Sequence, residues 1–196
     1  MITNTNATTY TLRPATLDDA YTIWQVMDTC AQNLEHKEYF ICDDLDYVID
    51  ILSGNGFAVV ACDTTGQIVG NLLVKYPKLT NENLGYDVFV DSTNTQVPLS
   101  TCNIKLTPEN LKRVVHMDSA TVLPSHRGHE LERKMISYGE SLIDTSKYSY
   151  SFATVAPDNL ASLKSLTRNN YQILTTKEKY DGLTRHIMLK ILSTPN

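Results

Sequence analysis

Apolar residues in the first part of the chain recur at spacings that predict a short strand followed by a helix. Residues 9–13 alternate between apolar and polar side chains, and Pro14 ends this strand or confines it to the edge of a sheet. Asp18 and Asp19 place negative charge in the first turn of the helix, where it suits the helix dipole. One apolar stripe predicts that the helix packs on a sheet. The stripe consists of Ala20, Ile23, Trp24, Met27, Ala31 and Leu34.

A second helix and a hairpin are predicted next. An acidic pair at residues 43–44 opens the helix, and Gly54 closes it. Residues 57–62 and 68–74 are continuous apolar runs, and the Asp-Thr-Thr-Gly between them has the composition of a turn. Gly70 interrupts the second run, which indicates a bulge or the close approach of another backbone. The apolar residues in register along the helix are Leu45, Val48, Ile49 and Leu52.

The middle of the chain combines a long polar stretch with a strand, a turn and a helix. Residues 77–110 are rich in Asn, Thr, Ser and Pro, which predicts a long loop of a kind that is often functional. Thr107 and Pro108 are residue types that cap and begin a short helix. Residues 114–123 have the pattern of a buried strand, and residues 124–128 that of a tight turn. The helix that follows has its apolar residues at Leu131, Met135, Ile136, Leu142 and Ile143.

The end of the chain predicts a strand, a helix and two more strands. Residues 148–155 form the first strand, and an Asp-Asn pair at 158–159 caps a helix that carries leucines at helical spacing. Residues 171–174 and 185–192 form the last two strands, joined through residues 177–182. The whole order is strand, two helices, three strands, helix, strand, helix and two strands. It predicts a mixed α/β (α+β) fold with a partly antiparallel central sheet and helices on both faces.

Composition and charge limit the classes of function. With 196 residues, we expect one domain at 9–192, an extended or disordered N-terminus at 1–8 and a tail at 193–196. The net charge of −5 argues against a protein that binds nucleic acid through its phosphates. The 4 cysteines lack Cys-x-x-Cys spacing, so we expect reduced thiols and no metal. No signal-peptide core and no run of ~18 apolar residues is present, so we expect a cytoplasmic protein without membrane partners.

The strand, turn and helix over residues 114–142 carry the first indication of a ligand. The turn is basic, contains glycine and opens a helix, so free backbone N–H groups and the positive end of the helix dipole face outward there. Arg127 adds a full positive charge. This combination predicts a site for an anion such as phosphate.

The same stretch resembles the pyrophosphate-binding signature of the GNAT superfamily of acetyl-CoA-dependent N-acetyltransferases, usually written Arg/Gln-x-x-Gly-x-Gly/Ala. Glu130 and Glu132 stand where that signature has its glycines or small residues. The residues that match the pattern and its surroundings are Val122, Pro124, Arg127 and Gly128.

Two further segments extend the resemblance to roughly residues 9–192. Residues 153–159, Ala-Thr-Val-Ala-Pro-Asp-Asn, followed by Ser162, resemble the strand and helix that hold the pantetheine arm in this superfamily, with Asn159 as its typical residue. Residues 179–186 resemble a Tyr-Gly-Gly-Leu-x-Arg ending found in bacterial members. The resemblance implies the GNAT fold and acetyl-CoA as acyl donor.

The resemblance also implies which residues contact acetyl-CoA. Backbone groups of Ala120 and Val122 on the central strand would pair with pantetheine, and Asn159 and Ser162 would hold it from the other side. The turn would bind the pyrophosphate through backbone N–H groups. Its residues are His126, Arg127, Gly128, His129, Glu130 and Leu131.

Two residues of the central strand are alternative candidates for the base that deprotonates the acceptor amine. His116 and Asp118 stand at positions i and i+2, so they share one face of the strand. A histidine titrates near neutrality and suits this role, whereas an aspartate would need a raised pKa. Some members of the superfamily carry a glutamate near the position of His116. A purely structural hydrogen bond is the alternative role for both residues.

The general acid is left unassigned by the sequence. Leu166 stands where the superfamily often has a tyrosine that protonates the CoA thiolate, and Ser165 or Tyr171 are substitutes. The leading expectation is transfer of an acetyl group from acetyl-CoA to a primary amine of a small molecule or protein by direct attack. The alternative is a catalytically weakened or inactive GNAT-like domain for ligand sensing or interaction. A homodimer is a further expectation, because late strands often pair in this fold.

Overall fold

The computed structural model describes residues 9–77, 108–180 and 182–193, and the elements appear in the predicted order. The predicted N-terminal segment, most of the predicted loop at 77–110 with the Thr107 cap, and most of the tail lie outside the described residues. The first half contains β1 (Thr11–Pro14), α1 (Ala20–Gln32), α2 (Leu45–Asp50), β2 (Gly56–Cys62) and β3 (Ile68–Lys75). The second half contains β4 (Val114–Val122), α4 (Leu131–Ser141), β5 (Tyr150–Val155), α5 (Leu160–Arg168), β6 (Gln172–Lys179) and β7 (Leu183–Ile191).

The described strands form one seven-stranded sheet in the order β1-β2-β3-β4-β5-β7-β6. β4 and β5 pair in parallel, and the other neighbouring strands pair antiparallel. The parallel pair occurs where α4 carries the chain across one face of the sheet between β4 and β5, as parallel strands require. The prediction of a mixed, partly antiparallel sheet is therefore confirmed.

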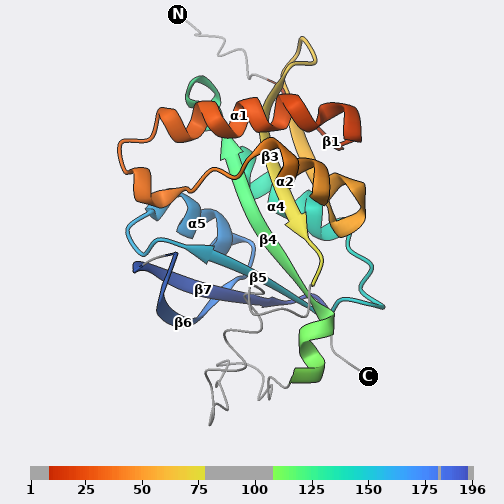
Figure 1. The fold of residues 1–196 in the computed structure, drawn as a ribbon, viewed down its shortest axis with the longest axis vertical. Coiled ribbons are helices and arrows are strands. Elements are labelled where there is room, and N and C mark those ends of the chain that lie inside the picture. Colours follow the sequence, from red (N-terminus) through yellow and green to blue (C-terminus); the bar gives the residue numbers. More distant parts are fainter. Residues whose placement is uncertain (1–8, 78–107, 181, 194–196) are drawn as a thin grey trace, which may run out of the picture.

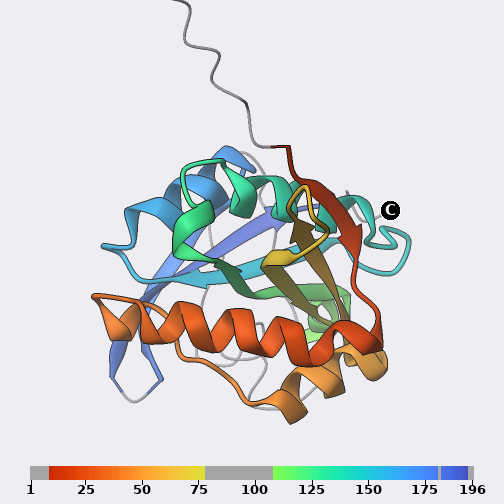
Figure 2. The ribbon, with the colours of Figure 1, turned by 90° about the horizontal axis from the view of Figure 1, so that it is seen from above.

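Helices cover both faces of this sheet (Figures 1 and 2), as predicted. Along β2, Val59 and Ala61 pack into a cluster with residues of α4, whereas Ala58 and Val60 pack into a second cluster with residues of α1 and α2. Both faces of the strand are thus buried, which explains why its sequence is a continuous apolar run. Figure 2 shows α1 and α2 on one side of the sheet and α4 and α5 on the other.

Among the predicted boundaries that differ from the structure, those of the first helix and of β6 have clear causes. The first helix begins as a 3-10 turn at Leu17–Asp19, where Arg13 binds Asp19 at 2.7 Å, and α1 starts only at Ala20. β6 continues to Lys179, so the prediction that residues 177–179 belong to a connection was wrong. A register shift between Ile173 and Thr175 interrupts the alternation of this strand and hides its length in the sequence.

Both features predicted as alternatives at Gly70 in β3, a bulge and the close approach of another backbone, are present. The pairing of β2 with β3 is irregular beside it, with a register shift between Ala61 and Cys62. An added Cβ at Gly70 would also lie 2.9 Å from the carbonyl oxygen of Thr121 on β4. This glycine therefore permits the close pairing of β3 with β4, the strand on which the site is built.

Candidate functional site: a cleft between β4 and β5 and a polar cluster beside it

β4 and β5 separate halfway along β4. Their pairing runs from Val114 to Met117, and the described part of β4 beyond Met117 is paired only with β3. Opposite β3, Leu73 pairs with Ser119 and Val74 with Met117, so the residue between them, Asp118, forms a bulge. Figure 1 shows the two strands converging at one end and diverging toward the other. Past the bulge, one edge of β4 therefore offers its backbone groups to a ligand.

A cleft of about 580 Å³ occupies the space between the separated strands. Its walls come from the second half of β4, the turn before α4, the first half of α4, the end of β5 and one side of α5. Further lining residues come from α1 and the segment after it: Cys30, Leu34, Tyr39 and Phe40. Nine of the ten residues predicted to contact the cofactor line the cleft, the exception being His129. Of the two base candidates, Asp118 lines it and His116 does not.

The turn between β4 and α4 presents backbone groups at one end of the cleft. Gly128 has φ 83°, and Glu130, the N-cap residue of α4, has φ 57°. No side chain caps this helix, so the N–H groups of its first turn face outward. The Nε of Arg127 donates to the carbonyl of Val122 at 3.2 Å, which holds its positive charge at the turn. Tyr10, just before β1, contacts His126, with 3.1 Å between its hydroxyl and Nδ1.

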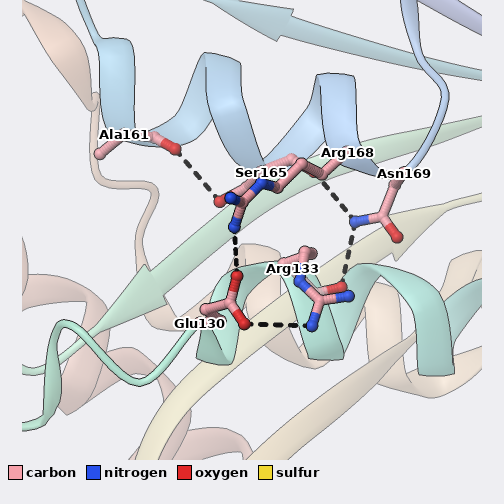
Figure 3. A network of polar contacts seen from close by, with 6 residues as sticks. All are labelled: Glu130, Arg133, Ala161, Ser165, Arg168 and Asn169. Atoms are coloured by element: carbon pink, nitrogen blue, oxygen red, sulfur yellow. Dashed lines mark hydrogen bonds and ion pairs between the residues drawn. The ribbon is translucent and has the colours of Figure 1, made fainter.

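The carboxylate of Glu130 is bound by two arginines (Figure 3). Arg133 donates to one oxygen at 3.2 Å, and Arg168 on α5 binds the other. The hydrogen bond and charge of Arg133, together with Arg168, lower the pKa of Glu130. Its negative charge is thus offset by two positive charges, and the left-handed backbone that glycine would favour is present at this residue.

Asn159 and Ser162 connect α5 to α4. The side chain of Asn159 caps α5 by accepting a hydrogen bond from the Ser162 N–H at 3.2 Å. The hydroxyl of Ser162 donates to Glu132 on α4 at 2.6 Å. Burial raises the pKa of Glu132, and the hydrogen bonds of Ser162 and Ser165 oppose that shift. These contacts fix the spacing between the two helices that border the cleft.

A hydrogen-bonded group of four side chains lies on the other side of β4, and we call it the polar cluster. His116 and Asp118 share a face of the strand, as predicted, with Nδ1 3.2 Å from Oδ1. The hydroxyl of Tyr47, on α2, donates to the second carboxylate oxygen of Asp118 at 2.8 Å. Lys75 donates to the Tyr47 hydroxyl at 3.2 Å.

The polar cluster keeps Asp118 ionised although the residue is largely buried. Burial would raise the pKa of Asp118, but the hydrogen bond and charge of His116, the Tyr47 hydroxyl and the charge of Lys75 bring it below its ordinary value. Sequence reasoning missed Tyr47 and Lys75. They lie 71 and 43 residues before Asp118, and no local motif marks them.

The two substitutes for the general acid occupy different surroundings. Tyr171 is 2% exposed, and its hydroxyl lies 2.7 Å from Ser151 inside the core rather than at the cleft. Ser165 lines the cleft, where its hydroxyl donates to the carbonyl of Ala161 at 3.1 Å. Leu166 also lines the cleft and is buried.

Among the described residues, no three His, Cys, Asp or Glu side chains gather in a way that could hold a metal ion. None of the described helices combines the length and apolar character of a membrane span.

Comparison with known proteins identifies the fold. No protein-family model and no curated protein sequence matches the chain. Among solved structures, it is similar to yncA of Salmonella typhimurium, assigned as an acetyltransferase and solved with its cofactor acetyl-CoA (TM-score 0.67, 15% identity, 96% of each chain covered). It is also similar to a GNAT-family acetyltransferase from Streptococcus pneumoniae (TM-score 0.63, 11% identity, 93% and 99% covered). A third is ribosomal-protein-alanine N-acetyltransferase from Brucella melitensis (TM-score 0.64, 16% identity, 92% and 99% covered).

These likenesses extend over nearly the whole length of both chains in each pair. The chain therefore has the GNAT fold, the fold that the motifs around Arg127 and Asn159 led us to expect.

Proposed function

We propose that this chain is an acetyl-CoA-dependent N-acetyltransferase that acetylates a primary amine by direct attack on the thioester. The observation that carries the proposal is the cleft between the separated halves of β4 and β5. The uncapped N-terminus of α4 lies at one end of this cleft, and the polar cluster, which includes Asp118, lies beside it. The Salmonella neighbour was solved with acetyl-CoA, which supports this donor.

The residues present fit acetyl-CoA. The free edge of β4 supplies backbone groups at Ala120 and Val122 for the amides of the pantetheine arm, as an added strand would require. The outward N–H groups of the turn, with the Arg127 side chain, suit a pyrophosphate. Both arginines beside Glu130 offset the carboxylate that would otherwise repel it.

The chemistry requires three things of the protein: the amine must lose a proton, the thioester carbonyl must be polarised, and the two groups must be held together. His116 and Asp118 are the groups proposed for the first task. The thiol of CoA has a pKa near that of free cysteine, about 8.5, so its departure as thiolate needs little assistance from a general acid.

The acceptor is proposed by class only. The Brucella neighbour is named for ribosomal-protein alanine, which supports a protein amino group as one class, and small primary amines form the other. A panel that includes short peptides with free N-termini and small diamines would separate them. The class that releases thiol from acetyl-CoA would be the acceptor class.

Calorimetry with CoA, followed by thiol release from acetyl-CoA with this amine panel, tests the proposed function. We expect CoA binding that weakens about 10-fold in Arg127→Gln, because a charged contact with phosphate is lost. Lys147→Gln, on a surface loop away from the cleft, is the matched control and should bind like the wild type. Absence of CoA binding would refute the proposal. CoA binding without thiol release would favour a ligand-sensing domain instead.

A further inference from the structure

Basic side chains gather along the part of the cleft that is bordered by α4 and α5. The chain as a whole has a net charge of −5, so this concentration of positive charge is local. Lys164 and Arg168 stand four residues apart on α5 and therefore share one face of that helix. A positive region on an acidic protein favours an anionic ligand. Among the described residues that line the cleft, the Lys and Arg side chains are Arg127, Arg133, Lys164 and Arg168.

The acidic residues that line the cleft have different partners. The carboxylate of Asp118 belongs to the polar cluster. Glu132 accepts a hydrogen bond from the hydroxyl of Ser162 at 2.6 Å. Glu130, by contrast, binds the arginines. It is therefore the acid that neutralises part of the positive charge beside α5.

The carboxylate of Glu130 lies between two guanidinium groups that come from different helices (Figure 3). One oxygen accepts from Arg133 on α4 at 3.2 Å, and the other accepts from Arg168 on α5. Arginines bind the oxygens of a phosphate group with the same kind of charge-assisted hydrogen bonds. The carboxylate of Glu130 therefore marks a position where the protein can hold an anion.

The backbone around this position is fixed, whereas the charged groups are accessible. Asn169 is 7% exposed, and its side-chain amide donates to the carbonyl groups of Arg133 and Ser165, each at 3.0 Å (Figure 3). This contact holds Arg168 opposite Arg133. The side chains of Glu130, Arg133 and Arg168 are 45%, 33% and 52% exposed. Ion pairs this accessible are weak, so an anion of higher charge can replace the carboxylate.

We infer that Arg133, Lys164 and Arg168 form a subsite for the 3′-phosphate of CoA, and that this phosphate displaces the carboxylate of Glu130 when CoA binds. The inference rests on the proposed acetyltransferase function. CoA carries a pyrophosphate, which suits the turn before α4, and a phosphate monoester on the ribose next to it. A phosphate monoester has a charge of about −1.5 to −2 near pH 7 and three acceptor oxygens. A carboxylate has one charge and two oxygens, so the monoester is the stronger partner for these cations.

Calorimetry with CoA and with dephospho-CoA, which lacks only the 3′-phosphate, tests the subsite. We expect the wild-type protein to bind CoA about 10-fold more tightly than dephospho-CoA, because charge-assisted hydrogen bonds to the monoester are lost. Equal affinities for the two ligands would overturn the inference. Wild-type protein that binds neither ligand would refute the proposed function and the subsite together, whereas equal binding of both refutes the subsite alone.

Variants of the basic residues separate the two phosphate groups. Arg168→Gln should weaken CoA binding about 10-fold and change dephospho-CoA binding less than about 2-fold. Arg168→Lys keeps the charge and should recover part of the CoA affinity. Arg127→Gln, at the pyrophosphate turn, should weaken both ligands by the same factor. Lys134→Gln, at an exposed position of α4 outside the cleft, is the matched control and should bind both ligands like the wild type. Equal losses for the two ligands in Arg168→Gln would place this arginine at the pyrophosphate and overturn the subsite.

The displacement of Glu130 has a test of its own. Glu130→Gln removes the charge that competes for Arg133 and Arg168, so its affinity should rise more for CoA than for dephospho-CoA. Equal gains for the two ligands would show that the carboxylate only repels the pyrophosphate, and would overturn the displacement.

Phosphorus NMR of bound CoA distinguishes direct contact from a purely structural role of Arg168. The monoester and the pyrophosphate give separate signals, and we expect the monoester signal to shift when CoA binds to the wild-type protein. In Arg168→Gln this signal should return toward its position in free CoA, while the pyrophosphate signals stay as in the wild-type complex. A monoester signal that is unchanged on binding would contradict the inference, as would a shift that Arg168→Gln leaves in place.

Discussion

The two sides of β4 build their parts of the site by different means. On the side of α4, a large part of the cleft is formed by backbone groups and a turn that lie close together in the sequence, from Asp118 to Arg133, and β5 and α5 border it opposite. On the side of α2, the polar cluster is formed by side chains that only the fold brings together, such as Tyr47 and Asp118. The first kind of site tolerates changes of side chain. The second depends on each hydrogen bond.

Asp118 belongs to both the cleft and the polar cluster. As the bulged residue of β4, it begins the stretch that leaves β5, and its carboxylate is the centre of the polar cluster. A bulge re-aims the strand at one point. The separation of the strands and the orientation of the cluster thus have one structural cause.

The largest expected effect comes from disturbing the backbone that forms the cleft. Gly70→Ala places a Cβ 2.9 Å from the carbonyl oxygen of Thr121, a backbone atom that can move only with β4. We expect a loss of about 1–3 kcal/mol in the free energy of unfolding and weaker CoA binding. Urea unfolding and calorimetry measure the two. Gly66→Ala, in the open hairpin turn at φ 86°, should lose about 1 kcal/mol and keep CoA binding. Equal CoA affinity in both variants would contradict the link between Gly70 and the cleft.

The next effect is on the side of the polar cluster and depends on pH. Because burial raises the folded-state pKa of Asp43 to about 6, ionising it in the folded protein is unfavourable at higher pH. The penalty is complete above pH 6 and vanishes below about 3.9, the ordinary pKa of aspartate. Asp43→Asn should therefore stabilise the protein by about 1–2 kcal/mol at pH 8, after allowance for the solvent that reaches it, and not at pH 3.5.

Denaturant unfolding of Asp43→Asn at the two pH values measures this difference. Asp46→Asn, at an exposed position in the first turn of α2, is the matched control and should show no such pH-dependent gain. A destabilised Asp43→Asn at pH 8 would mean that the folded protein needs the carboxylate as an anion. This result would contradict the prediction that burial makes the ionised form unfavourable.

A smaller effect is expected where side chains join the two helices beside the cleft. Asn159→Ala removes the cap of α5 and should cost about 1 kcal/mol. Asn159→Ser and Asn159→Asp retain a capping oxygen and should recover most of that stability. Thermal unfolding checks this order. If capping is the main role of Asn159, Asn159→Asp also restores CoA affinity; if its amide binds the ligand, stability recovers and affinity does not.

The sequence predicted the cleft side of the site far better than the cluster side. The turn around Arg127 and Gly128 could be recognised because its donors are backbone groups of neighbouring residues, so a short motif describes them. His116 and Asp118 could be paired because a strand fixes the direction of residues two apart. Tyr47 and Lys75 could not, because their contacts depend on how α2 lies over the sheet.

The boundaries that sequence reasoning missed have similar causes. The alternation that marks β6 in the sequence ends early because a register shift breaks it, and only pairing with β7 shows that the strand continues. The sequence did not locate the bulge at Asp118: the apolar positions of β4 change phase across this residue, from Met117 to Ala120 and Val122, but only the pairing with β3 shows which residue is extra. Pairing between strands, like contacts between side chains, is a non-local property.

The smallest expected effect concerns Glu130, where backbone and side chain act in opposite directions. Glu130→Gly relieves a left-handed backbone, worth about 1 kcal/mol, and loses two ion pairs of an exposed carboxylate, which contribute little to stability. The free energy of unfolding should therefore change by less than about 1 kcal/mol.

CoA affinity is the sharper measure of Glu130. Because Arg133 and Arg168 already offset the carboxylate, we expect Glu130→Gly to bind CoA only about 2- to 10-fold more tightly, corresponding to about 0.4–1.4 kcal/mol. Glu130→Gln removes the charge and keeps the strained backbone, so it separates the two causes. If both variants bind CoA more tightly by the same factor, the charge of Glu130 limits binding. If only Glu130→Gly binds CoA more tightly, the strained backbone limits binding, and the cleft side of β4 is then a site made by main chain alone. Weaker binding in both variants would show instead that the carboxylate holds the two arginines in place for the ligand.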